Sequence, residues 1–239
     1  MRIRTNYGSG SEKMAKDPNS PKKDNFTRNL VVVVIVGVVL LMLVPTVLSK
    51  KSDNSAASPA LASVKDGYGI TFNADLTTAP KIDIYEDFQC PYCQGFEGLT
   101  GSYIDELISK KEAKVVYHLM SFIGLESLSA ANAAGCAADE GKFSEFHKLL
   151  YANQPKTENS GTWTNQYLKA AGQGVGISSQ KFSSCIDDLK YANWTKNIAS
   201  DSAKKNVNST PTIFINDKKI DNAKDLLSLD TFKAAVARG

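Results

Sequence analysis

Two cysteines separated by two residues are the strongest candidates for chemistry in this chain. The motif Cys90-Pro91-Tyr92-Cys93 follows the β-rich run 81–85 and precedes apolar residues at helical spacing, so Pro91 would start a helix. A thiol at the start of a helix lies near the positive end of the helix dipole, which favours its ionised form. Because the thiolate attacks and leaves in disulfide exchange, the motif predicts a reversible redox disulfide between Cys90 and Cys93.

A permanently closed structural disulfide and half of a zinc site are the alternative interpretations of this motif. A zinc site needs further cysteine or histidine ligands, and the chain has no second cysteine pair at this spacing. His118 and His147 are expected to stand alone, one on a strand and one on a helix. We therefore expect no metal site.

Hydrophobic periodicity indicates the elements that must position the motif. Runs of β-branched and aromatic residues predict strands, and apolar residues three and four apart predict helices. Strands are expected at 69–72, 81–85, 114–122, 212–215 and 218–220. Helices are expected at 91–111, throughout about 125–206, and at 229–236. Because a helix joins strands 81–85 and 114–122, these two strands should be parallel.

The first quarter of the chain is expected to lie outside the folded body. Residues 30–48 are uncharged and long enough to span a hydrocarbon core of about 30 Å as a transmembrane anchor. The run is longer than the apolar region of a cleaved signal peptide, which is the alternative. Residues 1–29 carry the excess of positive charge and are predicted to be a disordered cytoplasmic tail. Residues 49–66 would be a flexible linker, and residues 67–239 the extracellular body of a single-pass protein of the cell membrane.

The other two cysteines, Cys136 and Cys185, fall in the long helical region of this exported body. In an oxidising compartment this even remainder suggests one structural disulfide between two helices. Closing that loop would contribute about 4 kcal/mol in the chain-entropy model. A second redox centre is the alternative.

Charge and composition exclude other classes of function. The net charge of +3 is small and the basic residues of the body are scattered, which argues against a surface that follows nucleic-acid phosphates. There is no flavin or haem signature, so we expect no cofactor. We expect a monomer.

Two segments, YEDFQCPYC (85–93) and STPTIFIN (209–216), resemble the DsbA-like branch of the thioredoxin superfamily. A third segment, GCAADEGKF (135–143), is similar to the inserted domain of exported, membrane-anchored DsbA-like proteins of Gram-positive bacteria, and the resemblance is to the actinobacterial type. The resemblance covers residues 70–239. It implies an α/β thioredoxin fold with an all-helical domain inserted at about 125–206, between the helix of the cysteine motif and a cis-proline strand.

By the same resemblance Pro211 would be a cis proline facing the cysteine pair, and Thr210 would offer its backbone to an incoming peptide. From the residues alone, a trans bond is the commoner state. Such relatives carry an acid six residues before the first cysteine, where this chain has Ile84. Glu86 and Asp87 are the nearby candidates for handling protons, unless they are solvated charges at the end of a strand.

The resemblance implies a thiol-disulfide oxidoreductase that oxidises reduced, unfolded exported proteins. A membrane quinone-linked partner of the DsbB or VKOR type would reoxidise it. A reductase or isomerase using the same cysteines, and a non-catalytic binding module, are the alternatives. An isomerase would usually bring a dimerisation domain, which residues 1–80 do not contain.

Overall fold

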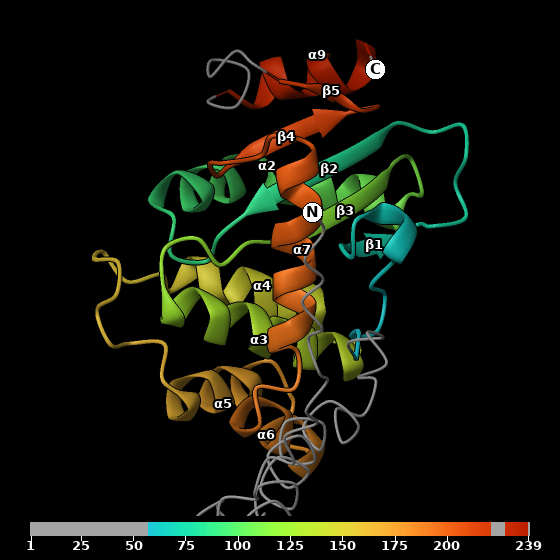
Figure 1. Cartoon of the computed structure of the whole chain (residues 1–239). Helices are drawn as coiled ribbons and strands as arrows, with labels where there is room; N and C mark the ends of the chain where they lie inside the picture. The colour runs from blue at the N-terminus through green and yellow to red at the C-terminus, as the bar shows by residue number, and fades with distance from the viewer. Residues whose placement is uncertain (1–56, 221–227, 239) are drawn as a thin grey trace, which may run out of the picture. The chain divides into compact units, whose positions relative to one another are not determined.

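The computed structural model describes residues 57–220 and 228–238, and Figure 1 shows a mixed sheet with helices around it. Its strands are β1 (Ile70–Phe72), β2 (Lys81–Glu86), β3 (Lys114–Leu119), β4 (Thr212–Ile215) and β5 (Lys218–Lys219). Their order across the sheet is β1-β3-β2-β4-β5. The predicted parallel pairing of β2 with β3 is confirmed, and the other neighbours are antiparallel.

The central strands are buried because their apolar residues pack on both faces of the sheet. Ile82 and Ile84 of β2 are fully buried and pair in register with Val115 and Tyr117 of β3. Such continuous burial is typical of a strand covered on both faces. The carboxyl end of β2 therefore lies inside the protein, and the residues that follow it lead directly into the cysteine motif.

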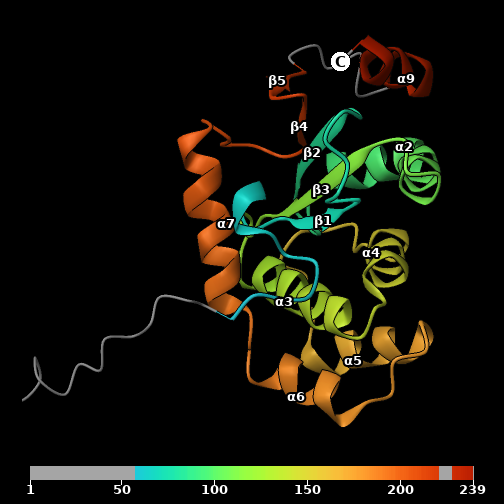
Figure 2. The same cartoon turned by 90° about the vertical axis from the view of Figure 1, so that its right-hand side faces the viewer.

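The helices lie on both sides of the sheet and beyond it. They are α2 (Pro91–Ser109), α3 (Leu125–Asp139), α4 (Phe143–Ala152), α5 (Asn165–Gly174), α6 (Gln180–Asp187), α7 (Ala192–Lys204) and α9 (Leu229–Arg238). Figure 2 shows α2 and α7 on opposite sides of the sheet, and α5 and α6 farthest from it, beyond α3 and α4. Helices α3 to α7 thus occupy the chain between β3 and β4, where the helical insertion was expected.

Two predicted elements differ from those in the structure. The strand predicted at 114–122 stops at Leu119, because the amides of Phe122 and Ile123 bond to the Asp87 side chain instead of continuing the sheet. The region predicted to be helical throughout about 125–206 is instead divided into the separate helices α3 to α7, with a long non-helical segment at 153–164. Between α6 and α7, Leu189 adopts a left-handed φ of 47°. A bulky residue rarely continues a helix in that conformation.

The linker predicted at 49–66 is also shorter than expected, because its last residues pack against the folded body. Ala62 forms a β-bridge with Ile70, residues 64–66 form a short 3-10 helix, and the amide of Ala60 donates to Asp139 at 2.9 Å. The predicted tail (1–29) and anchor (30–48) lie outside the described residues. Among the residues that are described, no helix is both long and apolar enough to cross a membrane.

Candidate active site

The cysteine pair lies where the chain leaves β2 and enters α2. Cys90 is the N-cap of α2, with an extended backbone, and Pro91 takes the first helical position as predicted. The amide of Cys90 donates to the carbonyl of Asp87 at 2.9 Å, which closes the turn between strand and helix. Both Cys90 and Cys93 are free thiols in this structure. Tyr92 between them is 75% exposed, whereas Cys90 is only 5% exposed and Cys93 is fully buried.

The surroundings of the two thiols drive their acidities in opposite directions. The hydrogen bond from the Cys93 thiol is the main cause that lowers the pKa of Cys90 to about 6. The Thr210 side chain and the backbone N–H groups of Tyr92 and Cys93 add to this effect and outweigh burial. Burial raises the pKa of Cys93, and its hydrogen bond to Cys90 raises it further. At neutral pH the pair therefore carries its negative charge on Cys90.

The chain returns to this pair at the start of β4. The Thr210-Pro211 peptide bond is cis, as the resemblance implied, and it directly precedes β4. The Sγ of Cys90 lies 3.3 Å from the carbonyl oxygen of Thr210. The sheet sets this approach, because β4 pairs with β2 and brings Thr212 opposite Tyr85. The structure therefore brings together the predicted residues of the motif and of the proline loop.

Asp87 is fully buried and organises the loops beside the motif. One of its oxygens accepts hydrogen bonds from the amide of Gln89 at 2.9 Å and the hydroxyl of Ser127 at 2.6 Å. The other accepts from the amides of Phe122 and Ile123 at 2.9 and 3.3 Å. Four donors occupy the carboxylate, so its evident role is structural. The alternative expectation, that Asp87 is a solvated charge at the end of a strand, was wrong because Asp87 is buried. A role for Asp87 in handling protons stays a prediction.

Glu86 is also fully buried and contacts His147 of α4, with 2.5 Å between Glu86 Oε1 and His147 Nε2. Glu97 of α2 lies beside them. Burial raises the pKa of Glu86 and of Glu97 to about 8 each, and burial lowers the pKa of His147. The expectation that His118 and His147 stand alone was wrong, because His118 likewise contacts Asp83 at 2.9 Å.

The buried acid on β2 nearest to the cysteines is Glu86, whereas the resemblance would place an acid at the position of Ile84. Residues 84 and 86 point to the same face of the sheet, because side chains alternate along a strand. Ile84 at the usual position is part of the core, and Glu86 lies two residues nearer the cysteines. The charge of Cys90 helps to raise the pKa of Glu86, and the charge of Glu86 helps to raise the pKa of Cys93. A proton-handling role for Glu86 stays a prediction.

Two glutamines that the sequence analysis did not single out hold the helical region against the motif. The side-chain amide of Gln154 donates to the carbonyls of Phe88 and Cys90 at 2.7 and 3.0 Å. Gln94 donates from α2 to the carbonyl of Tyr151 at 2.8 Å. Nothing in the sequence distinguishes these glutamines from surface residues, because their partners are backbone carbonyls far away along the chain.

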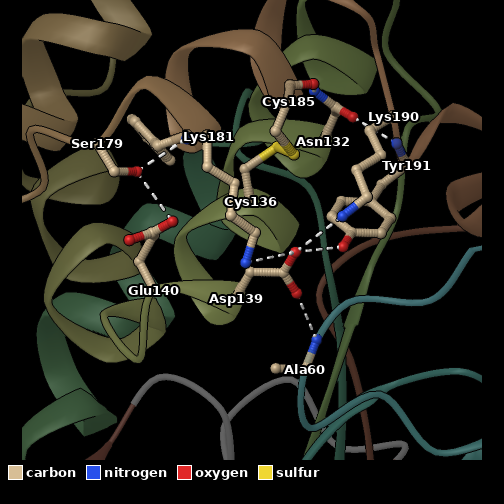
Figure 3. A network of polar contacts seen from close by, with 11 residues as sticks. Ala60, Asn132, Cys136, Asp139, Glu140, Ser179, Lys181, Cys185, Lys190 and Tyr191 are labelled. Carbon is tan, nitrogen blue, oxygen red and sulfur yellow. Dashed lines mark hydrogen bonds and ion pairs between the residues drawn. A yellow bond between two sulfur atoms is a disulfide. The ribbon is translucent and has the colours of Figure 1, made fainter.

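The second cysteine pair is joined as predicted, by a disulfide between Cys136 of α3 and Cys185 of α6 with a Cα–Cα distance of 5.9 Å. Figure 3 shows polar contacts on both sides of it. Asn132 accepts from the amide of Tyr191 at 2.7 Å, and Asp139 accepts from the Tyr191 hydroxyl at 2.5 Å. The disulfide and these contacts tie α3 to α6 and to the turn before α7.

Trp194 and Tyr191 pack over the α3 backbone at Gly135, the residue before Cys136. The helix leaves room for the Trp194 ring at Gly135, where an added Cβ atom would come within 3.2 Å of that ring. The indole N–H of Trp194 donates to the carbonyl of Tyr68 at 2.7 Å, so the ring also holds the segment before β1.

Comparison with known proteins places these features in a family. The sequence model of the family described as thioredoxin matches residues 75–236. Among curated proteins, Na(+)/H(+) antiporter NhaA 1 of Mycobacterium sp. (strain KMS) is 31% identical over 150 residues. That match covers 61% of this chain but 23% of the antiporter, so it concerns only a part of that protein.

Two further relatives are similar over more of their length. Disulfide bond formation protein D of Bacillus subtilis (strain 168) is 28% identical over 144 residues, which cover 59% of this chain and 65% of that protein. The solved structure of MdbA, a thiol-disulfide oxidoreductase from Actinomyces oris, superposes with a TM-score of 0.63 at 23% identity. It covers 78% of this chain and 98% of the MdbA chain, and this likeness shows the fold.

Proposed function

This chain belongs to the thioredoxin family, and from that premise we propose that it is a membrane-anchored thiol-disulfide oxidoreductase that oxidises the thiols of exported proteins. The observation that carries the proposal is the contrast between its two thiols. Cys90 at the helix start has a pKa lowered to about 6, whereas Cys93 is fully buried and its pKa is raised. A stabilised Cys90 thiolate favours the reduced form of the pair, which makes the disulfide more oxidising.

The reaction starts from the oxidised pair. A client thiolate attacks the Sγ of Cys90 and breaks the Cys90–Cys93 bond, and the Cys93 sulfur leaves and takes up a proton. The second client thiol loses its proton and attacks the client sulfur of the mixed disulfide, which releases Cys90 as a thiolate. Two electrons pass from the client to the enzyme pair, and the client gains a disulfide. The low pKa of Cys90 speeds the second step, because a more acidic thiol is a better leaving group.

The surface beside Cys90 supports a polypeptide client. Tyr92 within the motif is 75% exposed and Phe122 is 46% exposed. Asp87 holds the loop of Phe122 beside the loop that leads to Cys90, through the amide bond at 2.9 Å. Exposed aromatic side chains next to a reactive sulfur suit the apolar residues of an unfolded chain.

The location and the partners of the enzyme are further parts of the proposal. Residues 30–48 would anchor the protein in the cell membrane with the tail (1–29) in the cytoplasm and the body outside. A membrane quinone-linked reoxidase of the DsbB or VKOR type would take the two electrons from the reduced pair. The name of the Bacillus subtilis relative, disulfide bond formation protein D, supports the oxidising direction.

The reduction potential of the Cys90–Cys93 pair tests the direction of electron flow. We would equilibrate the full chain with glutathione buffers and quantify the free thiols of this pair by alkylation and mass spectrometry. We expect a potential closer to that of DsbA, about −120 mV, than to that of thioredoxin, about −270 mV. A potential as negative as that of thioredoxin would contradict the oxidase and favour a reductase.

A further inference from the structure

Three side chains that commonly bind metal ions meet on the buried side of the active-site helix. They are Glu86 at the end of β2, Glu97 on α2 and His147 on α4. One potential ligand atom from each lies within 4.8 Å of the other two. The donors come from three separate elements, and the closest pair, Glu86 Oε1 and His147 Nε2, is 2.5 Å apart.

Among the described residues, no lysine or arginine forms an ion pair with the two carboxyl groups of the cluster, and His147 is their one basic neighbour at contact distance. Glu86 is fully buried, and by distance and angle its Oε2 makes no hydrogen bond among the described residues, nor does Oε1 of Glu97. Tyr151 and Glu97 nevertheless lie close enough to Glu86 to oppose the effect of burial on its pKa. The nearby cation Lys148 forms its ion pair with Asp105. An unpaired carboxylate is costly to bury. The cluster must therefore take up positive charge, either as protons or as a metal ion.

There is room for an ion and a route to it. A cavity of about 10 Å³ is lined by Glu97 and His147, and this is close to the smallest space that holds one water molecule. Glu97 also lines an open cavity of about 380 Å³ between α2 and α4. Gly98 and Gly101 line the same cavity without side chains that would block it. Glu97 thus borders both cavities, and we expect an ion to enter from solvent past Glu97.

We propose that Glu86, Glu97 and His147 form a binding site for one divalent transition-metal ion, for which Zn²⁺ is the best match. Zn²⁺ accepts imidazole nitrogen and carboxylate oxygen at about 2.0–2.2 Å, with a solvent molecule as fourth ligand. Tetrahedral geometry at those bond lengths places two donors about 3.3 Å apart, so Glu86 and His147 separate by less than about 1 Å. Ca²⁺ fits poorly, because it requires six to eight oxygen ligands.

The experiment uses the full chain without a polyhistidine tag and with the Cys90–Cys93 pair oxidised. All four cysteine sulfurs are then in disulfides, so none can bind the metal. We would titrate ZnCl₂ into this protein by calorimetry and record X-ray absorption at the zinc edge. We expect one Zn²⁺ per chain, with a first shell of nitrogen and oxygen only at about 2.0–2.2 Å.

Two substitutions identify the ligands. Glu97→Gln and His147→Gln should each weaken Zn²⁺ binding at least tenfold, with folding checked by circular dichroism. Glu106→Gln is the matched control, because Glu106 lies on the same helix, pairs with Lys110 at the surface and should leave Zn²⁺ binding unchanged. The absence of saturable binding, or full binding by Glu97→Gln, would show that the cluster holds protons instead. If the variants unfold, an absorption spectrum of the wild-type protein that lacks an imidazole ligand overturns the proposal.

Discussion

At the scale of single residues, the two thiols of the motif have different parts to play because only one of them is ionised. Cys90 borders the exposed residues Pro91 and Tyr92, whereas Cys93 is fully buried beneath it. A client should therefore bond to Cys90 and never to Cys93. Their positions on α2 cause this difference, because Cys90 is the N-cap and Cys93 lies about one turn inside the helix.

Replacing each cysteine by serine tests this division. Cys93→Ser should accumulate a mixed disulfide when it meets a client peptide that carries a disulfide. The Cys90 thiolate attacks one client sulfur, the other client sulfur leaves as a thiolate, and the Cys93 thiol that would release Cys90 is missing. Cys90→Ser should form no adduct and lose essentially all oxidase activity. Non-reducing electrophoresis and mass spectrometry measure both results. An adduct on Cys93 in the Cys90→Ser protein at a comparable rate would contradict this assignment.

The pH dependence of Cys90 follows from its lowered pKa. The pKa is about 6 instead of an ordinary 9, so the stabilisation of the reduced fold by the thiolate is absent below about pH 6. It grows between about pH 6 and 9 and is complete above that range. The alkylation rate of Cys90 by iodoacetamide should have its midpoint at about pH 6, and the stability advantage over Cys90→Ala should rise in the same window. A midpoint above pH 8 would contradict the assignment of the charge.

At the scale of elements, the loop after β3 and the loop before α2 are held together by one buried side chain. Asp87→Ala leaves the amides of Gln89, Phe122 and Ile123 without their acceptor. We expect a loss of at least about 2 kcal/mol in the free energy of unfolding, measured with denaturant. The amides of residues 122 and 123 should also exchange their hydrogens faster.

Asp75→Ala is the control for this substitution. Asp75 is an exposed aspartate that pairs with Lys111 at 3.5 Å, and such surface pairs contribute little. We expect a change within about 0.5 kcal/mol for the control. Equal losses in the two variants would mean that Asp87 does not organise the loops.

The disulfide between α3 and α6 is a second feature that holds elements together. The double variant Cys136→Ser and Cys185→Ser should lower the free energy of unfolding by about 4 kcal/mol, because it removes a covalent constraint on the unfolded chain. Denaturant unfolding with the Cys90–Cys93 pair kept oxidised measures this loss. Oxidase activity in the native state should be retained, and its loss would indicate a second redox centre.

The residues that could be predicted from sequence are those whose signal is local. The spacing of Cys90 and Cys93, the strand before them and the proline at 91 lie within one short segment. The cis bond at Pro211 was implied only by the family resemblance of residues 209–216, because the residues alone favour a trans bond. His147 and Gln154 could not be assigned in this way, because their partners Glu86 and Phe88 are about sixty positions away in sequence and meet them only when α4 packs beside β2 and α2.

At the scale of the whole molecule, the helices between β3 and β4 contribute side chains to the candidate active site as well as forming a second layer. Gln154 reaches the motif from the loop after α4, His147 reaches Glu86 from α4, and Ser127 reaches Asp87 from α3. Removing this region would leave buried polar groups of the motif without partners. We infer that the sheet and the helices fold as one cooperative unit around the cysteines.

The membrane anchor is a prediction at the same scale. The full chain should remain in the membrane fraction after extraction with alkaline carbonate, and deletion of residues 30–48 should release it. External protease should digest the body of the anchored protein in intact spheroplasts and leave a cytoplasmic control protein uncut. Release of the full chain by carbonate would contradict an anchor at this position.

The close packing of Trp194 over Gly135 has an optical consequence. Disulfides quench nearby indole fluorescence, and the ring lies beside the backbone of the residue before Cys136. Emission from Trp194 should therefore brighten when the Cys136–Cys185 bond is cut. The chain has only two tryptophans, so a single substitution, Trp163→Phe, isolates this signal. Unchanged emission after this bond is reduced would show that the ring does not sense the disulfide.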